Sequence, residues 1–296
     1  MSQNKELPLA KKKKTKKLPY LLIAPAILLF CAFTFYPFIR ALVLSFAVTD
    51  KRGNFAKWVG IGNWIRVLKK DEFWQVVLVT IKMAAANLVF TFCIAMIFAL
   101  LATKKVRWSK VYQTMYALPM AIASSPAAAI FLFFFSQHNG VLNNLLGTDI
   151  SWLTTKGTAF WCVVTMTVWQ HIGTSFIFLL VGFRNVPEDL LESAWLDGAG
   201  PMQRIRKIIL PLASPQIFFV LFLNINNSFK CFNQIKLLTQ GGPANSTKTL
   251  IYYIYENAIV NGRFETACVQ AIFLFLMIFV LTRIQFALED KVVHYQ

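Results

Sequence analysis

Long runs of apolar residues, interrupted by short polar stretches, set the pattern of this 296-residue chain. The hydrocarbon core of a bilayer is about 30 Å thick and takes about 20 apolar residues of α-helix to cross. Nearly uncharged segments of at least that length occur at Leu18–Phe46, Val76–Ala102, Thr114–Phe135, Thr158–Phe183, Ile208–Phe229 and Ala267–Leu288. We therefore predict an all-α membrane protein with six transmembrane helices and with both termini on the same side.

The composition agrees with this pattern and excludes a soluble basic protein. Apolar residues make up 57% of the chain and charged residues only 15%, whereas soluble domains hold about 25% charged residues. The net charge of +17 sits at the edges of the predicted spans, and no soluble domain is present to carry a nucleic-acid site. We expect no nucleic-acid partner.

Basic residues indicate the orientation. Seven lysines precede the first span, and further clusters occupy the loops at 104–110 and 184–207. Such clusters stay on the cytoplasmic side and attract anionic lipid headgroups; the basic residues of the first loop are more dispersed and partly balanced by acids. We expect a multi-pass protein of the bacterial plasma membrane, with cytoplasmic tails at 1–17 and 291–296 and a transmembrane domain at 18–290.

Residues for enzymatic chemistry are scattered. The three histidines lie far apart without the spacing of a zinc site, and the five cysteines form no Cys-x-x-Cys pair. No phosphate-binding loop of the Gly-x-x-x-x-Gly-Lys-Ser/Thr type is present. We predict that the chain is not an enzyme, holds no metal and binds no cofactor, so that any ATP would be bound by another chain.

Polar side chains inside the predicted spans are costly and mark candidate functional positions. Asn224, Asn227 and Ser228 share one face of the fifth span, and Gln170 lies in the fourth. These side chains suit a path for a hydroxylated solute, and hydrogen bonding between helices explains them equally well. Lys82, near the outer end of the second span, is expected to snorkel outward.

The loop at 184–207 contains a short predicted helix. Pro187 suits a first helical turn, Glu188 and Asp189 follow where the helix dipole favours anions, and Gly198 lies where a left-handed residue would end the helix. The apolar residues of this helix are predicted to share one face; they are Leu190, Leu191, Ala194 and Trp195. A second, basic helix begins at Pro201 and enters the fifth span, with a bend at Pro211.

On these residues alone, such a helix can lie in the headgroups, pack on its own bundle or dock in a groove of a soluble partner. The motif Glu-Ser-Ala-Trp-Leu-Asp-Gly-Ala at 192–199, with Leu-Pro at 210–211, resembles the signature loop of permease subunits of binding-protein-dependent ABC importers. In that pattern Glu-Ala-Ala is followed, after three intervening residues, by Gly, and farther downstream by Ile-x-Leu-Pro. This chain differs by Ser193 and by Ile205, where an aromatic residue is usual.

The resemblance extends over the whole chain. Leu-Pro-Tyr-Leu-Leu-Ile-Ala-Pro at 18–25 and Gly-Gly-Pro at 241–243 are similar to the carbohydrate-type branch of these permeases. The C-terminal segment 291–296 is most similar to the first permease subunit of glycerol-3-phosphate importers. The solute implied is therefore a sugar or a compound like glycerol 3-phosphate.

The resemblance implies a type I ABC importer permease fold with a coupling helix between spans four and five. It implies four kinds of partner: a second permease, two ATP-binding subunits that hold ATP and Mg, an extracytoplasmic solute-binding protein, and membrane lipids. It assigns ATPase coupling to Leu190, Leu191, Glu192, Ala194, Trp195, Asp197, Gly198, Ala199 and Pro211.

Two other functions are consistent with a membrane bundle whose spans contain polar residues. An ion-coupled secondary transporter would need an acidic residue within the membrane, but all thirteen acidic residues lie in predicted tails, loops or span ends. A membrane-embedded enzyme would need a reactive cluster that the scattered histidines and cysteines do not provide. Solute uptake that requires both ATP and a separate nucleotide-binding chain distinguishes the importer from both alternatives.

Overall fold

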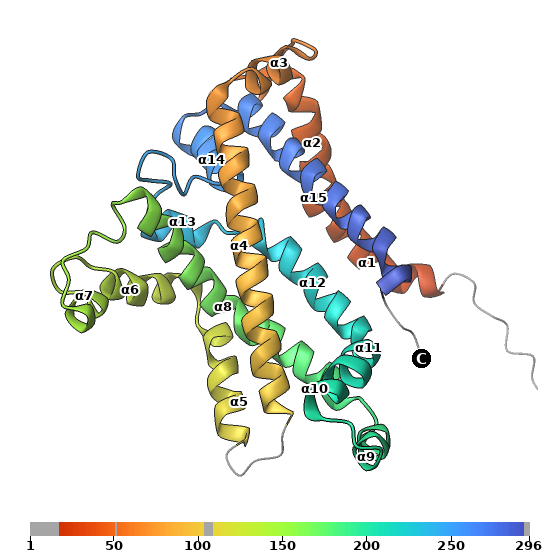
Figure 1. Ribbon diagram of the computed structural model, residues 1–296. Coiled ribbons are helices and arrows are strands. Elements are labelled where there is room, and N and C mark those ends of the chain that lie inside the picture. Colours follow the sequence, from red (N-terminus) through yellow and green to blue (C-terminus); the bar gives the residue numbers. More distant parts are fainter. Residues whose placement is uncertain (1–17, 51, 104–108, 293–296) are drawn as a thin grey trace, which may run out of the picture.

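Long helices and bent helix pairs make up the computed structural model, which describes residues 18–50, 52–103 and 109–292 (Figure 1). Within this part, four helices are long and apolar enough to cross a membrane: Pro19–Ser45, Asp71–Ala102, Lys156–Arg184 and Phe264–Glu289. Two bent pairs, Lys110–Ala121 with Ser124–Phe134 and Pro201–Leu212 with Ser214–Ser228, bring the number of crossings to six if each pair is one span. These units coincide with the six predicted segments. The predicted tail at 1–17 lies outside the described residues, as do residues 293–296 of the predicted tail at 291–296, whose first two residues continue the last helix.

The elements follow one another along the chain as helices with one small hairpin. The α-helices are α1 (Leu18–Phe30), α2 (Tyr36–Ser45), α3 (Gly62–Leu68), α4 (Asp71–Ala102), α5 (Ser109–Ala117), α6 (Ser124–Phe134), α7 (Val141–Leu146), α8 (Lys156–Arg184), α9 (Glu188–Leu196), α10 (Pro201–Arg204), α11 (Leu210–Leu212), α12 (Ser214–Ser228), α13 (Asn233–Leu238), α14 (Leu250–Tyr255) and α15 (Phe264–Val292). The 3-10 segment η2 (Leu118–Ala121), the π segments η1 (Cys31–Phe35), η3 (Ile205–Ile209) and η4 (Glu256–Val260), and the antiparallel strands β1 (Ala47–Thr49) and β2 (Phe55–Trp58) complete the set.

The centre of the bundle is the pair α4 and α8, with α12 packed on both (Figure 1). Ala95, Ala99 and Ala102 of α4 are fully buried there, in a cluster that also holds Phe176 and Leu179 of α8. Small side chains let membrane helices approach closely, which increases their van der Waals contact. The first span differs, because its most apolar window contains no buried residue and its contacts with the bundle are made chiefly by α2 on α15.

The third span is broken, and the continuous helix expected over Thr114–Phe135 is corrected here. Its two halves meet at an angle of 103°, where Ile122 and Ala123 have extended backbone angles. Pro119 and Pro126 flank this point and have no N–H to donate to the preceding turn. The helix therefore ends before the break and α6 begins in a new direction.

The fifth span bends by 72° between α11 and α12, close to the predicted bend at Pro211. Because Pro211 cannot donate a hydrogen bond, the preceding turn widens, and the N–H of Leu210 bonds to the carbonyl of Ile205. The bend itself lies at Ala213, just before Pro215, a second residue without an N–H. Two prolines four residues apart thus set the bend.

A buried lysine ties together the end of the bundle that carries α3 and α14. The Nζ of Lys248 lies 2.8 Å from Glu256 and 3.6 Å from Glu72 at the start of α4, and the lysine side chain is only 10% exposed. The hydroxyl of Tyr253 donates to Glu72 at 3.0 Å; burial and this carboxylate raise the pKa of Tyr253 to about 12. The buried charge of Lys248 is thereby neutralised within the chain.

Candidate functional site

The loop between α8 and α12 contains the short helix α9, built as its residues dictate. Pro187 caps its N-terminus with extended backbone, and Glu188 and Asp189 fill the first turn. Gly198 has a φ of +81°; its N–H donates to Trp195 O, and the next N–H, of Ala199, donates to Ala194 O at 2.8 Å. These two bonds form a Schellman cap, so the predicted helix and its left-handed glycine are present.

The four apolar side chains of the predicted face of α9 differ in how far the bundle buries them. Leu191 is half-buried against the bundle cluster around Ala95 and Ile209, and Ala194 is also half-buried. Leu190 and Trp195, by contrast, are 45% and 65% exposed. The reason is helical periodicity: at 3.6 residues per turn, Leu191 and Ala194 lie between Leu190 and Trp195 around the helix, so the middle of the apolar face anchors the helix and its two edges remain exposed.

Two further large apolar residues of this loop are exposed. Leu196 is 79% exposed and Met202, just after the turn, is 73% exposed. We call Leu190, Trp195, Leu196 and Met202 the α9 patch. Sequence reasoning missed Leu196 and Met202, although both are large apolar residues in a charged loop, because neither fits the motif. The polar candidates Glu192 and Asp197 are exposed on the same helix.

The α9 loop is attached firmly to the transmembrane helices. Val186, between α8 and α9, is 5% exposed in the same cluster as Leu191. Arg184, at the end of α8, donates from Nη2 to the carbonyl of Ala102 at the end of α4 at 3.3 Å, which satisfies a carbonyl that has no partner in its own helix. These contacts connect α9 to α4 and α8, and the chain continues from it through α10 and α11 to α12.

The polar candidates inside the bundle fall into two separate contacts. Asn224 of α12 accepts a hydrogen bond from Ser175 of α8 at 3.0 Å, which is the helix-to-helix bond that sequence left open as the alternative. Gln170 of α8 accepts one from Gln234 of α13 at 2.8 Å. Ser228 is also buried, and Asn227 is half-buried.

The partners Ser175 and Gln234 were not identified from the sequence. Ser175 is a small polar residue in the middle of the fourth span. Gln234 lies five residues beyond the expected end of the fifth span at Phe229, outside the six predicted spans. Its bond to Gln170 places α13 beside the middle of α8.

The central part of the chain and its C-terminal part match a known protein family. Residues 92–294 match the model of the "Binding-protein-dependent transport system inner membrane component". The chain belongs to this family. Similar curated proteins are the sn-glycerol-3-phosphate transport system permease protein UgpA of Escherichia coli O157:H7, 34% identical over 291 residues, and that of Agrobacterium fabrum, 34% identical over 284. The matches cover 96% and 95% of this chain and 97% of each relative.

Solved structures agree with the fold. A bacterial ABC transporter involved in the import of the acidic polysaccharide alginate matches with a TM-score of 0.84 at 23% identity, over 94% of this chain and 96% of that one. The MetNI methionine ABC transporter matches with a TM-score of 0.58 at 14% identity, over 76% of this chain and all of that one. The type I ABC importer permease fold is thereby confirmed.

The chain is accordingly a multi-pass permease of an ABC importer in the plasma membrane, and a secondary transporter is not favoured. No group of three or more histidine, cysteine or acidic side chains able to hold a metal occurs among the residues that the structure describes.

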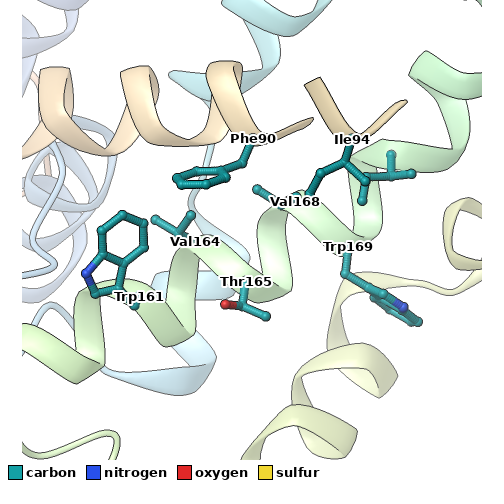
Figure 2. Close-up of a pocket in the computed structure, with 8 residues that line it drawn as sticks. Phe90, Ile94, Trp161, Val164, Thr165, Val168 and Trp169 are labelled. Atoms are coloured by element: carbon teal, nitrogen blue, oxygen red, sulfur yellow. The ribbon is translucent and has the colours of Figure 1, made fainter. Parts of the chain in front are cut away.

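An apolar groove between α4 and α8 is unsuited to a polar solute (Figure 2). Phe90 and Ile94 of α4 lie across it from α8, and Trp161 and Trp169 lie towards its two ends. Its volume is about 280 Å³ and the Thr165 hydroxyl is nearly its only polar group. Apolar chains fit such a surface, whereas hydroxyls would lose their hydrogen bonds to water there.

Proposed function

We propose that this permease forms half of a translocation path for a sugar or a solute like glycerol 3-phosphate, and that α9 docks in a cleft of a separate ATP-binding subunit. The observation that carries this proposal is that Leu191 anchors α9 on the bundle while Leu190 and Trp195, at the two edges of the same apolar face, remain exposed. Exposed apolar residues on a short helix suit docking into a groove of a partner. The anchored middle of the face turns that docking into movement of the spans.

The basic residues support the orientation in the membrane. Lys110, Arg184, Arg206 and Lys207 lie near the α9 end of the bundle or on α10 to η3, and clusters of this kind favour the cytoplasmic side. The α9 end then faces the cytoplasm and the ATP-binding subunits. The α3 and α14 end faces outward, towards an extracytoplasmic binding protein, and both termini are cytoplasmic.

Alternating access follows from this arrangement. When two ATP-binding subunits close, they carry α9 of this chain and the matching helix of a second permease with them. Val186 and Arg184 transmit the displacement to α8 and α4, and the bend at Ala213 lets α12 change its angle. The first span, without buried residues in its apolar window, is covered by the second permease or by lipid.

Reconstitution tests the proposal. The permease pair, the ATP-binding subunits and the binding protein are placed in proteoliposomes, and uptake of radiolabelled sn-glycerol 3-phosphate and of a neutral disaccharide is measured. We expect uptake of one of these solutes only with ATP, the ATP-binding subunits and the binding protein all present. Uptake driven by an ion gradient without ATP would refute the importer function.

A further inference from the structure

Lys236 of α13 lies deep in the membrane-spanning region and not in an outer loop. Its neighbour Gln234 bonds to Gln170, the middle residue of the 29-residue helix α8. Gln170 is about 21 Å along the helix axis from Lys156 at a rise of 1.5 Å per residue, in a hydrocarbon core about 30 Å thick. Ile235, fully buried, packs among residues of the same part of α8.

The ammonium group of Lys236 is held on an aromatic cluster. Its Nζ lies 4.6 Å from the ring centroid of Tyr255 and 5.6 Å from that of Phe232. The two rings are 5.1 Å apart, and Tyr252 adjoins both. A cation over aromatic rings is attracted to their faces, and this contact keeps the side chain from extending to the headgroups.

Lys236 has no acidic partner, in contrast to Lys248. Within residues 18–50, 52–103 and 109–292, Lys248 is the lysine that has acidic partners, and these partners are Glu256 and Glu72. Lys236 is exposed in the single chain. Aromatic faces do not accept hydrogen bonds from its ammonium N–H groups as a carboxylate would. Charged side chains at membrane depth face the interior of a bundle or a water-filled path and mark substrate pathways.

We infer that Lys236, positioned by Tyr255 and Phe232, is an anion-binding point of the translocation path. Its ligand is an anionic oxygen of the solute, on a phosphate monoester or a carboxylate. This inference rests on the proposed function and narrows it to anionic solutes. The names of the similar proteins agree, since sn-glycerol 3-phosphate and the acidic polysaccharide alginate are both anions.

The test compares Lys236→Gln, Lys236→Arg and the control Lys69→Gln in the complete reconstituted assembly. Lys69 is exposed after α3, so its variant removes the same charge away from the path. Two parallel arms use sn-glycerol 3-phosphate and an oligouronate, to distinguish phosphate from carboxylate. The readouts are membrane abundance, binding-protein-stimulated ATPase activity and solute carried per ATP hydrolysed.

We expect Lys236→Gln to lower the solute carried per ATP at least about 10-fold, as a hydrogen bond to a charged group is worth about 1.5–3 kcal/mol. Abundance and ATPase activity should persist, Lys236→Arg should restore transport, and Lys69→Gln should match wild type. Unchanged transport by Lys236→Gln, or equal loss in the Gln and Arg variants, would overturn the inference. Uptake of a neutral sugar, but of neither anion, by the wild-type assembly would also overturn the inference. That result would leave the importer function intact. Absence of any ATP-driven uptake would instead refute the proposed function.

Discussion

The two ends of this molecule differ in how their side chains are partnered. At the α3 and α14 end, Lys248 is buried between Glu72 and Glu256 and the Tyr253 hydroxyl completes the network. At the α9 end, Trp195 and Leu196 stand 65% and 79% exposed on a helix anchored from behind by Leu191. The buried charge network of the first end is completed within one chain, whereas the exposed apolar residues of α9 are surface that another chain would cover.

This difference separates stability from coupling. A change in the charge network should alter folding and leave docking alone, because its contacts are internal. A change at the exposed residues of α9 should alter docking and leave folding alone, because those side chains contribute little to the bundle. Substitutions at the two ends should therefore have separable effects.

Substitution of Gly198 should have the largest effect. No atom lies within 4 Å of a Cβ built at this glycine, but its φ of +81° strains any other residue. The strain is about 1–2 kcal/mol, too little to prevent insertion of the bundle, and Gly198→Asp adds a charge beside the docking surface. We expect normal abundance, loss of ATPase co-purification and uptake below about a hundredth of wild type, since a docking loss above 2.7 kcal/mol is a factor of 100.

Gly198→Ala is the matched control, because it introduces the strain without the charge. Uptake by the Ala variant should lie between those of wild type and Gly198→Asp. The coupling role of α9 fails if the Asp variant, at normal abundance, imports solute as wild type does.

Trp195→Ala tests an exposed edge of the apolar face of α9. Large aromatic residues at the centre of interfaces often contribute about 2 kcal/mol or more, so we expect the affinity for the ATP-binding subunit to fall about 30-fold. The thermal midpoint of the purified permease should not change. Affinity is measured by titrating the ATP-binding subunit onto permease in nanodiscs.

Leu191→Ala is the control in the anchored middle of the same face. It should lower the thermal midpoint by removing contacts with the bundle, and should weaken docking less than Trp195→Ala does. If the two variants exchange these effects, the assignment of anchored and exposed residues of α9 is reversed.

Lys248→Met tests the other end of the molecule. Loss of one partner of a buried pair costs about 3–5 kcal/mol, which partial exposure of Glu72 (42%) and Glu256 (28%) reduces to about 1–3 kcal/mol. We expect a thermal midpoint lower by about 2–10 °C and unchanged docking. Adding Glu256→Gln should recover part of the loss; a variant as stable as wild type but impaired in docking would contradict the separation of the two ends.

The sequence predicted most of the fold and part of the site. Segment length and the lack of charge located the six crossings, and Pro187 and Gly198 located both ends of α9, because a proline and a left-handed glycine act on the backbone locally. The 103° break in the third span was missed. Pro119 and Pro126 signal weakened hydrogen bonding, but whether a helix kinks or turns away depends on what packs against it.

The membrane class, the α9 helix and the family motif follow from the sequence alone, since they depend on local composition and backbone preference. Which residues of α9 are anchored follows only from tertiary contacts, because distant residues such as Ala95 and Ile209 belong to the cluster on which α9 packs. Tertiary contacts also bring α13 to the middle of α8 through Gln234, which places Lys236, outside the six predicted spans, at the depth of the membrane interior. Hydropathy along a chain measures how apolar a segment is, whereas depth and exposure depend on contacts between segments far apart in sequence.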